Sequence, residues 1–341
     1  MISNWSAYLY DKSDVFVAEL PMEGLSIEYV LNDVWNAQIR VNYLVFKGWL
    51  KKQNTTISNV FTAGFRYVVI QRNGVTQFKG ILCEPYLERF ETDVNVVIPF
   101  KSWLAYFTRR YITKSYTATD AGAIAWDMIN TAQAETYGDI GITAGTIDAT
   151  VNRDLDRQRD EVAASIIHLS SDKIKDGFEF EITHDKALTV KTRIGADKPN
   201  IVFESTNIKS WRFSYILGLS LTNRVHALGE GFGSDQLVEV RNASSTYQDK
   251  WYLLEKAESF LSVSNPATLQ DHGDKILALD QDARLDGLTI KVDTGVIDPT
   301  TYDTGDGVKI IIENIIDSLY RIRRKTYNVS QDDEVIDLEL F

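Results

Sequence analysis

The chain of 341 residues contains one cysteine and no long apolar run. A single cysteine excludes an intramolecular disulfide and a cluster of thiolate metal ligands. It ends the apolar stretch Gly80-Ile81-Leu82-Cys83, so we expect a buried and unreactive thiol. No segment reaches the roughly 20 apolar residues that a membrane-spanning helix needs. We therefore expect no membrane insertion by this chain.

A secretion signal is also lacking at the start of the sequence. Met1-Ile2-Ser3-Asn4-Trp5-Ser6 has neither a basic nor an apolar region. We therefore expect the protein to be soluble and to fold in a reducing cytoplasm. In that compartment the Asn-x-Ser/Thr sequences have little meaning; they begin at Asn4, Asn54, Asn242 and Asn328.

Basic residues are in the minority, with 36 Lys and Arg against 48 Asp and Glu and a net charge of −12. A nucleic-acid-binding protein usually has the opposite sign, at least in one patch. Solubility is the simplest interpretation of this excess. The 44% hydrophobic content is enough to fill the cores of two or more domains. Scattered aromatic residues favour a β-rich fold over a coiled coil or a disordered tail.

Motifs of catalysis are absent as well. The sequence has no His-x-x-x-His pair and no Gly-x-Ser-x-Gly elbow, and no carboxylate pair is marked as catalytic. The glycines of Gly229-x-Gly231-x-Gly233 follow a predicted strand, as in a phosphate-binding loop. However, Gln236–Val240 after them predicts another strand, where such a loop requires a helix. We interpret the glycines as a turn.

Two further sets of polar residues are interpreted as structural. One set of aspartates lacks the spacing of a calcium loop, and turn chemistry explains it: Asp293, Asp298, Asp303 and Asp306. The histidines are dispersed and are interpreted as structural side chains: His168, His184, His226 and His272. We predict no enzyme, no cofactor and no metal site.

The first 105 residues or so predict β structure. Short apolar or alternating runs, including Gln38–Val45 and Arg66–Gln71, are separated by polar breaks. Asn73-Gly74 between two such runs predicts a tight hairpin, because both residues tolerate positive φ. Several short strands at this spacing favour a barrel or a sandwich.

The period then changes to that of a helix. Thr119–Ala134 has apolar residues at helical spacing, with Thr119 or Asp120 as N-cap, and Leu155–Ser171 repeats the pattern. Phe178–Ile182 and Ala187–Arg193 predict a pair of strands. These elements form an α/β unit set between β segments.

From Ile208 to Leu228 the sequence again predicts strands. Asn265-Pro266 predicts the start of a helix, with Asn265 as N-cap and proline at the first helical position. The apolar stripe of that helix is Leu269, Ile276, Leu277 and Leu279. Strands resume at Leu288–Val292 and continue to the last residue.

Two segments of the chain share a pattern, Tyr67–Phe100 and Val308–Phe341. Each predicts a strand, a polar turn, a second strand, an acidic turn and a final strand that ends in Phe. Aligned without a gap they share six identities, Ile70/Ile311, Asn73/Asn314, Ile81/Ile322, Tyr86/Tyr327, Val94/Val335 and Phe100/Phe341. A basic run in the second segment has no basic equivalent in the first: Arg321, Arg323, Arg324 and Lys325. These residues are either a solvated strand face or candidates for contact with another subunit.

The order of these elements resembles that of the siphophage tail hub proteins, also called baseplate hub proteins, of long-tailed bacteriophages. The likeness covers nearly the whole chain and rests on loose motifs in a fixed order. These are Thr119-Asp120-Ala121-Gly122-Ala123-Ile124 before Gly138-Asp139-Ile140-Gly141-Ile142, Val162–Leu169 before Gly177-Phe178-Glu179-Phe180, Asn223-Arg224-Val225, and Thr304-Gly305-Asp306-Gly307-Val308 before Tyr320-Arg321-Ile322.

The resemblance implies an α+β fold, mostly β, with two tail-tube-like β-barrel domains, an inserted α/β domain and a second small insertion. The expected bounds are 1–110 for the first barrel and 111–207 for the α/β domain. The second barrel is split into 208–232 and 285–341, around a small insertion at 233–284.

The resemblance also implies a function. Three chains would place six barrels in a ring that joins the hexameric tail tube to the three-fold tail tip or baseplate and lines the DNA channel. Acidic side chains in that channel would let DNA pass without specific binding. Expected partners are two further copies of the chain, tail tube or distal tail protein rings, and tail tip, fibre or spike proteins. The expected location is the virion tail tip, after synthesis and assembly in the host bacterial cytoplasm.

Two alternatives from other classes stay open. Trp5, Trp35 and Trp251 would suit a carbohydrate-binding module on a virion if they were exposed. The chain would alternatively be a cell-wall hydrolase component whose site has no recognisable motif. Because the second predicted barrel ends at Phe341, we expect a hydrolase or fibre to be a separate polypeptide.

Overall fold

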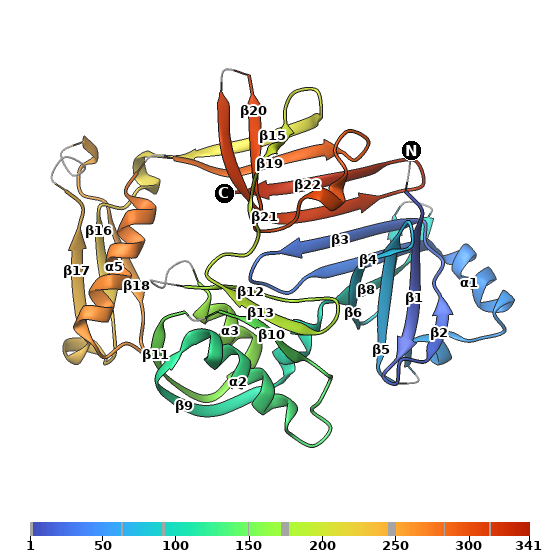
Figure 1. Ribbon diagram of the computed structural model, residues 1–341, viewed down its shortest axis with the longest axis horizontal. Helices are drawn as coiled ribbons and strands as arrows, with labels where there is room; N and C mark the ends of the chain where they lie inside the picture. The colour runs from blue at the N-terminus through green and yellow to red at the C-terminus, as the bar shows by residue number, and fades with distance from the viewer. Residues whose placement is uncertain are drawn as a thin grey trace.

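The computed structural model describes residues 3–62, 64–90, 93–148, 150–171, 177–244, 250–282, 284–313 and 315–341. Strands dominate the regular structure, which confirms the expected α+β class with mostly β content. Figure 1 shows a large sheet, an inserted domain below it and a separate lobe at one side. We call residues 218–282 the lobe.

The first part of the chain contributes eight strands to the large sheet, which are β1 (Trp5–Asp11), β2 (Phe16–Glu19), β3 (Gly24–Val30), β4 (Asn36–Asn42), β5 (Arg66–Arg72), β6 (Val75–Leu82), β7 (Tyr86–Phe90) and β8 (Asp93–Lys101). Alternation sets their faces. On β3, Leu25, Ile27 and Tyr29 are buried while Ser26 and Glu28 are half-exposed. The predicted hairpin between β5 and β6 is confirmed, and Asn73 and Gly74 both have positive φ.

A helix replaces the end of one predicted strand in this part. Gln38–Val45 was expected to be β, but β4 ends at Asn42 and α1 (Tyr43–Lys52) begins there. The side chain of Asn42 accepts a hydrogen bond from the backbone N–H of Leu44 and caps the helix. The short π-helical turn Ser58–Thr62 follows. Phe46 of α1 stacks on Phe61 of that turn, and this contact fixes the helix against the sheet.

The last part of the chain contributes the remaining strands, β14 (Asp197–Phe203), β15 (Ile208–Ile216), β19 (Arg284–Asp293), β20 (Gly307–Ile312), β21 (Ile316–Val329) and β22 (Glu334–Leu340), and the turn η5 (Pro299–Thr301). The main path of the sheet is β15-β19-β22-β21-β3-β4-β8-β6-β5-β1-β2. The antiparallel pair β3–β21 is the seam between the two parts. Among the described residues no ladder joins β2 to β3, so the closing of each part into a barrel stays a prediction.

The predicted repeat has a counterpart in the strand pairing. β5, β6 and β8 are antiparallel neighbours, and so are β20, β21 and β22. The middle strand is displaced by two residues, because Ile70 pairs with Phe78 whereas its counterpart Ile311 pairs with Asp317. The aligned residues do not share a face, because Ile70 and Phe100 lie in the core of the large sheet whereas their counterparts Ile311 and Phe341 do not. Asn314, at the turn of the second copy, lies outside the described residues.

The inserted domain lies between the two parts of the sheet in sequence. Its elements are η2 (Trp103–Arg109), β9 (Tyr111–Asp120), α2 (Ala121–Gln133), β10 (Thr143–Ile147), β11 (Asn152–Glu161), α3 (Val162–Leu169), β12 (Glu179–Ile182) and β13 (Ala187–Lys191). Asp120 is the N-cap of α2, and β12 pairs with β13 as predicted. The helix expected over Leu155–Ser171 is wrong in its first half, because β11 forms a long ribbon with β9 and α3 begins at Val162. Pairing with a distant strand overrode the local pattern.

The lobe has a three-stranded sheet covered by one helix (Figure 1). It contains η3 (Gly218–Ser220), β16 (Arg224–Leu228), η4 (Gly233–Asp235), β17 (Val238–Asn242), β18 (Glu255–Ser259) and α5 (Pro266–Asp280). Asn265 caps α5, as predicted, and Leu269, Ile276 and Leu277 are buried while Leu279 is exposed. The segment expected as a strand at Leu219–Leu221 is largely the turn η3.

The strand pairing assigns two segments differently from the expected domain bounds. β16 was expected in the second barrel, but it pairs with β17 and β18 of the lobe. β14 was expected in the α/β domain, but it pairs with β20 of the large sheet. The expected bounds differ because each segment continues the β pattern of its neighbours in sequence, whereas the strands with which it pairs are remote in the chain. The division into four domains otherwise stays a prediction.

Candidate functional site: the basic segment of β21 and the polar cavity beside it

Arg321, the first residue of the predicted basic run, connects the large sheet to the inserted domain. Its guanidinium donates to both carboxylate oxygens of Glu179 on β12, at 2.7 and 2.8 Å. It also donates to the backbone oxygens of Gly305 and Ile194. This two-pronged geometry is specific to arginine. Within the monomer, Arg321 therefore holds β12 against β21.

Arg323 and Arg324 lie closer to solvent. The guanidinium of Arg323 is 5.0 Å from the centre of the Phe341 ring. Arg324 lies across the seam, with its guanidinium 3.6 Å from Glu28 on β3 and 3.5 Å from Glu339 on β22. Contact of these residues with another subunit stays a prediction.

Lys325 points to the interior, because the side chain is only 4% exposed. Its ammonium donates to the backbone oxygens of Pro299 and Tyr302 at 2.8 and 2.7 Å. It also lies 4.9 and 5.1 Å from the ring centres of Tyr302 and Tyr327. Burial lowers the pKa of Lys325, and the nearby carboxylates of Asp303 and Asp306 oppose that shift. In the monomer this lysine fixes the Pro299–Asp306 loop and presents almost no surface.

A polar cavity of about 240 Å³ adjoins Lys325. Three parts of the chain meet around it: the first part of the sheet through Tyr29 and Trp35, the inserted domain through Glu181 and His184, and the second part through Asp303. We call this the junction cavity. Sequence reasoning missed it, because its residues are far apart in the chain and form no motif.

Ionisable groups of the junction cavity are perturbed by their surroundings. Burial raises the pKa of Glu181, and the neighbouring Asp303 raises it further. Burial lowers the pKa of His184, whose ring packs edge-on against Trp35. The Nδ1 atom of His184 and the hydroxyl of Tyr302 are buried and have no hydrogen-bond partner among the described residues. Among the described residues that line the cavity, no nucleophile–base pair is in hydrogen-bond contact.

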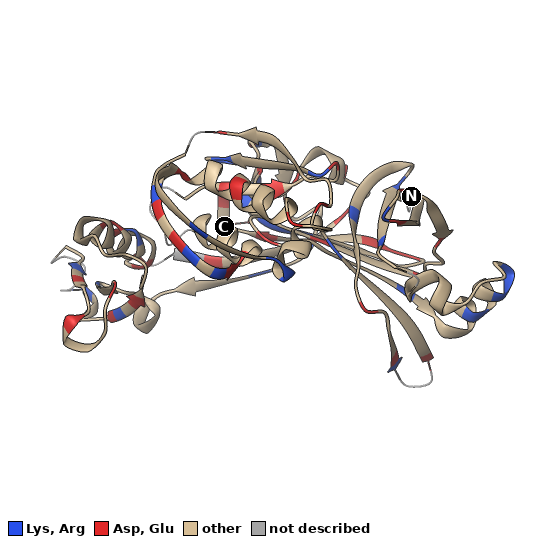
Figure 2. Cartoon of the chain, turned by 90° about the horizontal axis from the view of Figure 1, so that it is seen from below, with Lys and Arg blue, Asp and Glu red and all other residues tan. Residues whose placement is uncertain are grey.

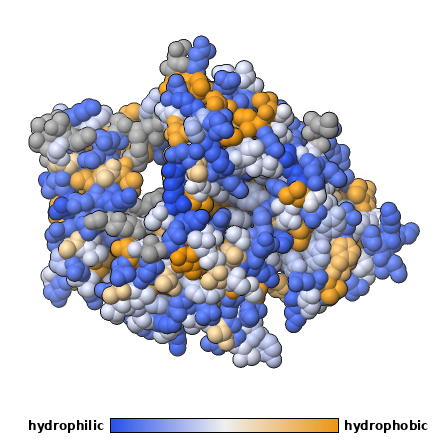
Figure 3. Space-filling model, in the orientation of Figure 1, coloured by the Kyte–Doolittle hydropathy of each residue, from blue (hydrophilic) through white to orange (hydrophobic). Residues whose placement is uncertain are grey.

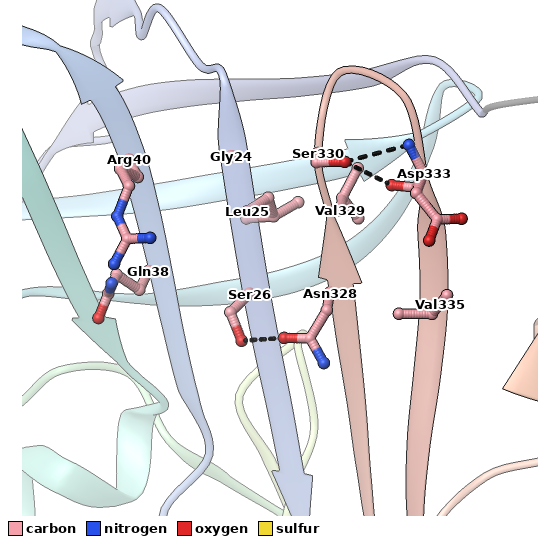
Figure 4. Close-up of a pocket in the computed structure, with 10 residues that line it drawn as sticks. All are labelled: Gly24, Leu25, Ser26, Gln38, Arg40, Asn328, Val329, Ser330, Asp333 and Val335. Atoms are coloured by element: carbon pink, nitrogen blue, oxygen red, sulfur yellow. Dashed lines mark hydrogen bonds between the residues drawn. The ribbon is translucent and has the colours of Figure 1, made fainter. Parts of the chain in front are cut away.

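A second depression lies on the seam between the two parts of the sheet. It has a volume of about 360 Å³ and is lined by polar and small residues of β3, β4, β21 and β22. Figure 4 shows Ser26 and Asn328 facing each other across the seam, and Ser26 donates a hydrogen bond of 3.3 Å to Asn328. The described residues that line it include no group of three or more His, Cys, Asp and Glu that could hold a metal ion.

The motifs that the sequence singled out behave as turns. Gly231 and Gly233 have positive φ, and β17 follows them, so the strand predicted after these glycines is confirmed. The carboxylates of Asp293 and Asp298 accept hydrogen bonds from the nearby backbone N–H groups of Gly295 and Thr300. Within the described residues no group of three or more His, Cys, Asp and Glu could hold a metal ion.

The three tryptophans proposed for sugar binding, Trp5, Trp35 and Trp251, do not form an exposed platform. Trp35 is buried, and half-buried Trp5 packs edge-on against Tyr327. The half-buried ring of Trp251 lies 5.2 Å from the ammonium of Lys250. The carbohydrate-binding alternative therefore loses two of its three candidate residues, because the rings of Trp5 and Trp35 pack toward the interior.

Figure 2 shows acidic and basic residues interleaved along the curved β9–β11 ribbon, although the whole chain carries −12. None of the helices in the described part of the chain combines the length and the apolar content that crossing a bilayer takes.

Comparison with known proteins gives a clear result for the fold. No family model and no curated protein sequence matches the chain. Among solved structures, a tail protein from Neisseria meningitidis MC58 has a TM-score of 0.65 at 14% identity, over 99% of this chain and 96% of that one. The 43 kDa tail protein of prophage MuSo2 from Shewanella oneidensis has a TM-score of 0.67 at 9% identity, over 99% and 98%.

The chain has the fold of phage tail proteins. The prophage tail protein gp18 from Listeria monocytogenes EGD-e is a third example, with a TM-score of 0.56 at 14% identity over 98% of this chain and 94% of that one. At these identities the likeness concerns the fold, and it extends over the large sheet, the inserted domain and the lobe alike. It agrees with the resemblance to tail hub proteins that the element order indicated.

Proposed function

We propose that this protein is a structural, non-enzymatic subunit of a phage tail hub. The observation that carries the proposal is the fold shared with two phage tail proteins over 99% of the chain and nearly all of each tail protein. A likeness of this extent includes both insertions. It therefore favours a common architecture over a single borrowed domain.

In this proposal three copies form a ring. The repeated three-stranded units, β5-β6-β8 and β20-β21-β22, give each chain two similar parts, so a ring of three chains has six. Such a ring matches a hexameric tube on one side and a three-fold tail tip on the other. Differences between the two units, such as the basic run of β21, then mark the positions at which the ring has only three-fold symmetry.

The proposed partners are a tail tube or distal tail protein ring, and tail tip, fibre or spike proteins. DNA passes through the centre without specific binding, and the net charge of −12 supports this because like charges repel. The proposed location is the tail tip of a virion assembled in the host bacterial cytoplasm.

Size and shape of the purified protein test the proposal. We expect a particle of three times 38.7 kDa by light scattering and a ring with a central opening by electron microscopy. A monomer that binds glycans would support the carbohydrate-binding module instead. Release of sugars or peptides from peptidoglycan by the purified chain would support a hydrolase and contradict the structural role.

A further inference from the structure

The main path of the large sheet ends in two edge strands, β15 and β2. Among the described residues β15 pairs with β19 alone, and β2 pairs with β1 alone. An unpaired strand edge presents backbone N–H and C=O groups that favour contact with another strand. Natural proteins usually protect such edges, so the residues on these two edges are informative.

β15 carries a row of aromatic side chains on one face. Trp211 stacks on Phe213 with ring centres 5.3 Å apart, and Phe213 meets Tyr215 at 5.5 Å. Trp211 and Tyr215 are 46% and 58% exposed. Trp211 is paired with Ile290, whose side chain is buried in the core of the large sheet. The apolar face of the sheet therefore continues onto an open edge.

Apolar residues also gather around this end of the sheet in the space-filling view. Figure 3 shows them on the face where β15, β19 and β20 lie. Leu217 and Leu219, just after β15, are exposed as well. Exposed apolar groups gathered in one place indicate a contact surface, whereas single ones do not.

The opposite end of the sheet has a matching apolar group. Phe16 of β2 and its neighbour Val15 are 55% and 57% exposed. The Phe16 ring lies against Tyr8 and Tyr10 of β1, with ring centres 6.5 and 6.0 Å apart. These contacts hold the exposed Phe16 ring on the face that β1 and β2 share.

The two edges also carry opposite charges. Arg212 lies on β15 and Glu19 on β2, and both side chains are exposed. Within the described residues neither side chain takes part in an ion pair. An arginine and a glutamate that meet between subunits would orient the contact.

We propose that β15 of one copy of this chain docks against β2 of the next copy. β15 and β2 are the first and last strands of the sheet path, so one chain does not bring them together. A single type of contact between copies covers both edges and brings Arg212 near Glu19, while the aromatic row of β15 lies on the other side of the sheet. Such a head-to-tail contact closes into a ring when the rotation allows it. The inference rests on the proposed ring and identifies the surfaces that form it.

The aromatic row provides the first test, in light scattering of the full chain. We expect the double variant Trp211→Ser, Tyr215→Ser to be monomeric at concentrations where the wild type is trimeric. The matched control is Tyr137→Ser, Tyr252→Ser, since these tyrosines are 98% and 88% exposed but lie on neither edge. We expect the control to remain trimeric. A trimeric edge variant would overturn the contact.

The charge pair provides a second test that does not depend on loss of apolar surface. Arg212→Glu and Glu19→Arg alone each weaken association by about tenfold or more, and together they restore it. If the single variants dissociate and the double variant does not associate again, the pairing of β15 with β2 is overturned. A wild-type trimer that no edge variant affects contradicts this contact and leaves the proposed function intact. A wild type that is monomeric at every concentration contradicts both.

Discussion

A buried lysine is unfavourable unless its ammonium group finds partners, and Lys325 satisfies this condition with backbone oxygens. Pro299 and Tyr302 supply these oxygens at 2.8 and 2.7 Å, and two tyrosine rings surround the ammonium. On the same strand, Arg321 holds the inserted domain through Glu179. Two of the four residues in the basic run thus organise the monomer, while Arg323 and Arg324 remain near the surface.

The pH dependence of stability should reveal His184. Burial lowers its pKa from the usual value of 6.5, so the unfolded chain binds a proton more readily than the folded one. The stability that neutral His184 contributes is complete above about pH 6.5 and is lost as the pH falls toward its lowered pKa. We therefore expect urea unfolding to show a smaller decrease in stability between pH 7 and 5.5 for His184→Gln than for the wild type.

Two other groups also have shifted pKa values and define the controls. The raised pKa of Glu181 acts in the opposite direction. The folded protein binds this proton more tightly than the unfolded chain does, so Glu181 adds stability as the pH falls. His168 also has a lowered pKa, caused by burial and then by Arg157. Both groups are unchanged in His184→Gln, so the difference between the two proteins isolates one imidazole. Identical pH profiles would mean that burial of His184 does not affect its protonation.

Among the elements, helices α2 and α5 show how a short signal in sequence fixes a boundary. Asp120 accepts a hydrogen bond of 2.9 Å from the N–H of Ala123, and Asn265 accepts one of 2.9 Å from the N–H of Ala267. These caps satisfy backbone donors that the first turn leaves free. They were predictable because the residue and its position together define the motif.

Loss of each cap should affect its own helix. We expect Asp120→Ala to lower stability by about 1 to 2 kcal/mol and to speed hydrogen exchange at the start of α2. Asn265→Ala should speed exchange in α5 of the lobe while α2 stays protected. Mass spectrometry of exchanged peptides measures both changes. If both variants speed hydrogen exchange in α2 to the same extent, the two helices do not open independently of each other.

Among the described residues, buried apolar side chains form three separate clusters. One fills the large sheet and includes residues from both parts, such as Ile39, Ile98, Ile310 and Ile336. A second lies in the inserted domain around Ile124 and Phe178, and a third in the lobe around Leu269. The shared core of the large sheet means that its two parts stabilise each other across β3–β21. The lobe has its own core.

Removal of the lobe is the corresponding test. Ile216 and Arg284 are opposite each other in the antiparallel pair β15–β19, so an Asn-Gly turn can join them in place of residues 217–283. We expect the shortened chain to fold, with a melting temperature within about 4 °C of the wild type. Circular dichroism during heating measures this. Loss of cooperative unfolding would show that the lobe supports the sheet.

The sequence by itself determined the local features. Alternating residues gave the strands of the first part, Asn73-Gly74 gave a hairpin, and Asp120 and Asn265 gave two helix starts, because neighbouring residues determine such features. It also indicated the repeat. However, identical residues of the two aligned segments, such as Tyr86 and Tyr327, do not pair with equivalent residues of the neighbouring strand, because the register differs by two residues.

The tertiary structure decided what depends on distant partners. β11 is a strand because β9 pairs with it, and β16 belongs to the lobe because β17 and β18 lie on either side of it. Lys325 is buried because the Pro299–Asp306 loop folds over it. The junction cavity and the open edges of β15 and β2 exist only once the sheet is assembled. Their residues are remote in sequence, and no local pattern encodes such contacts.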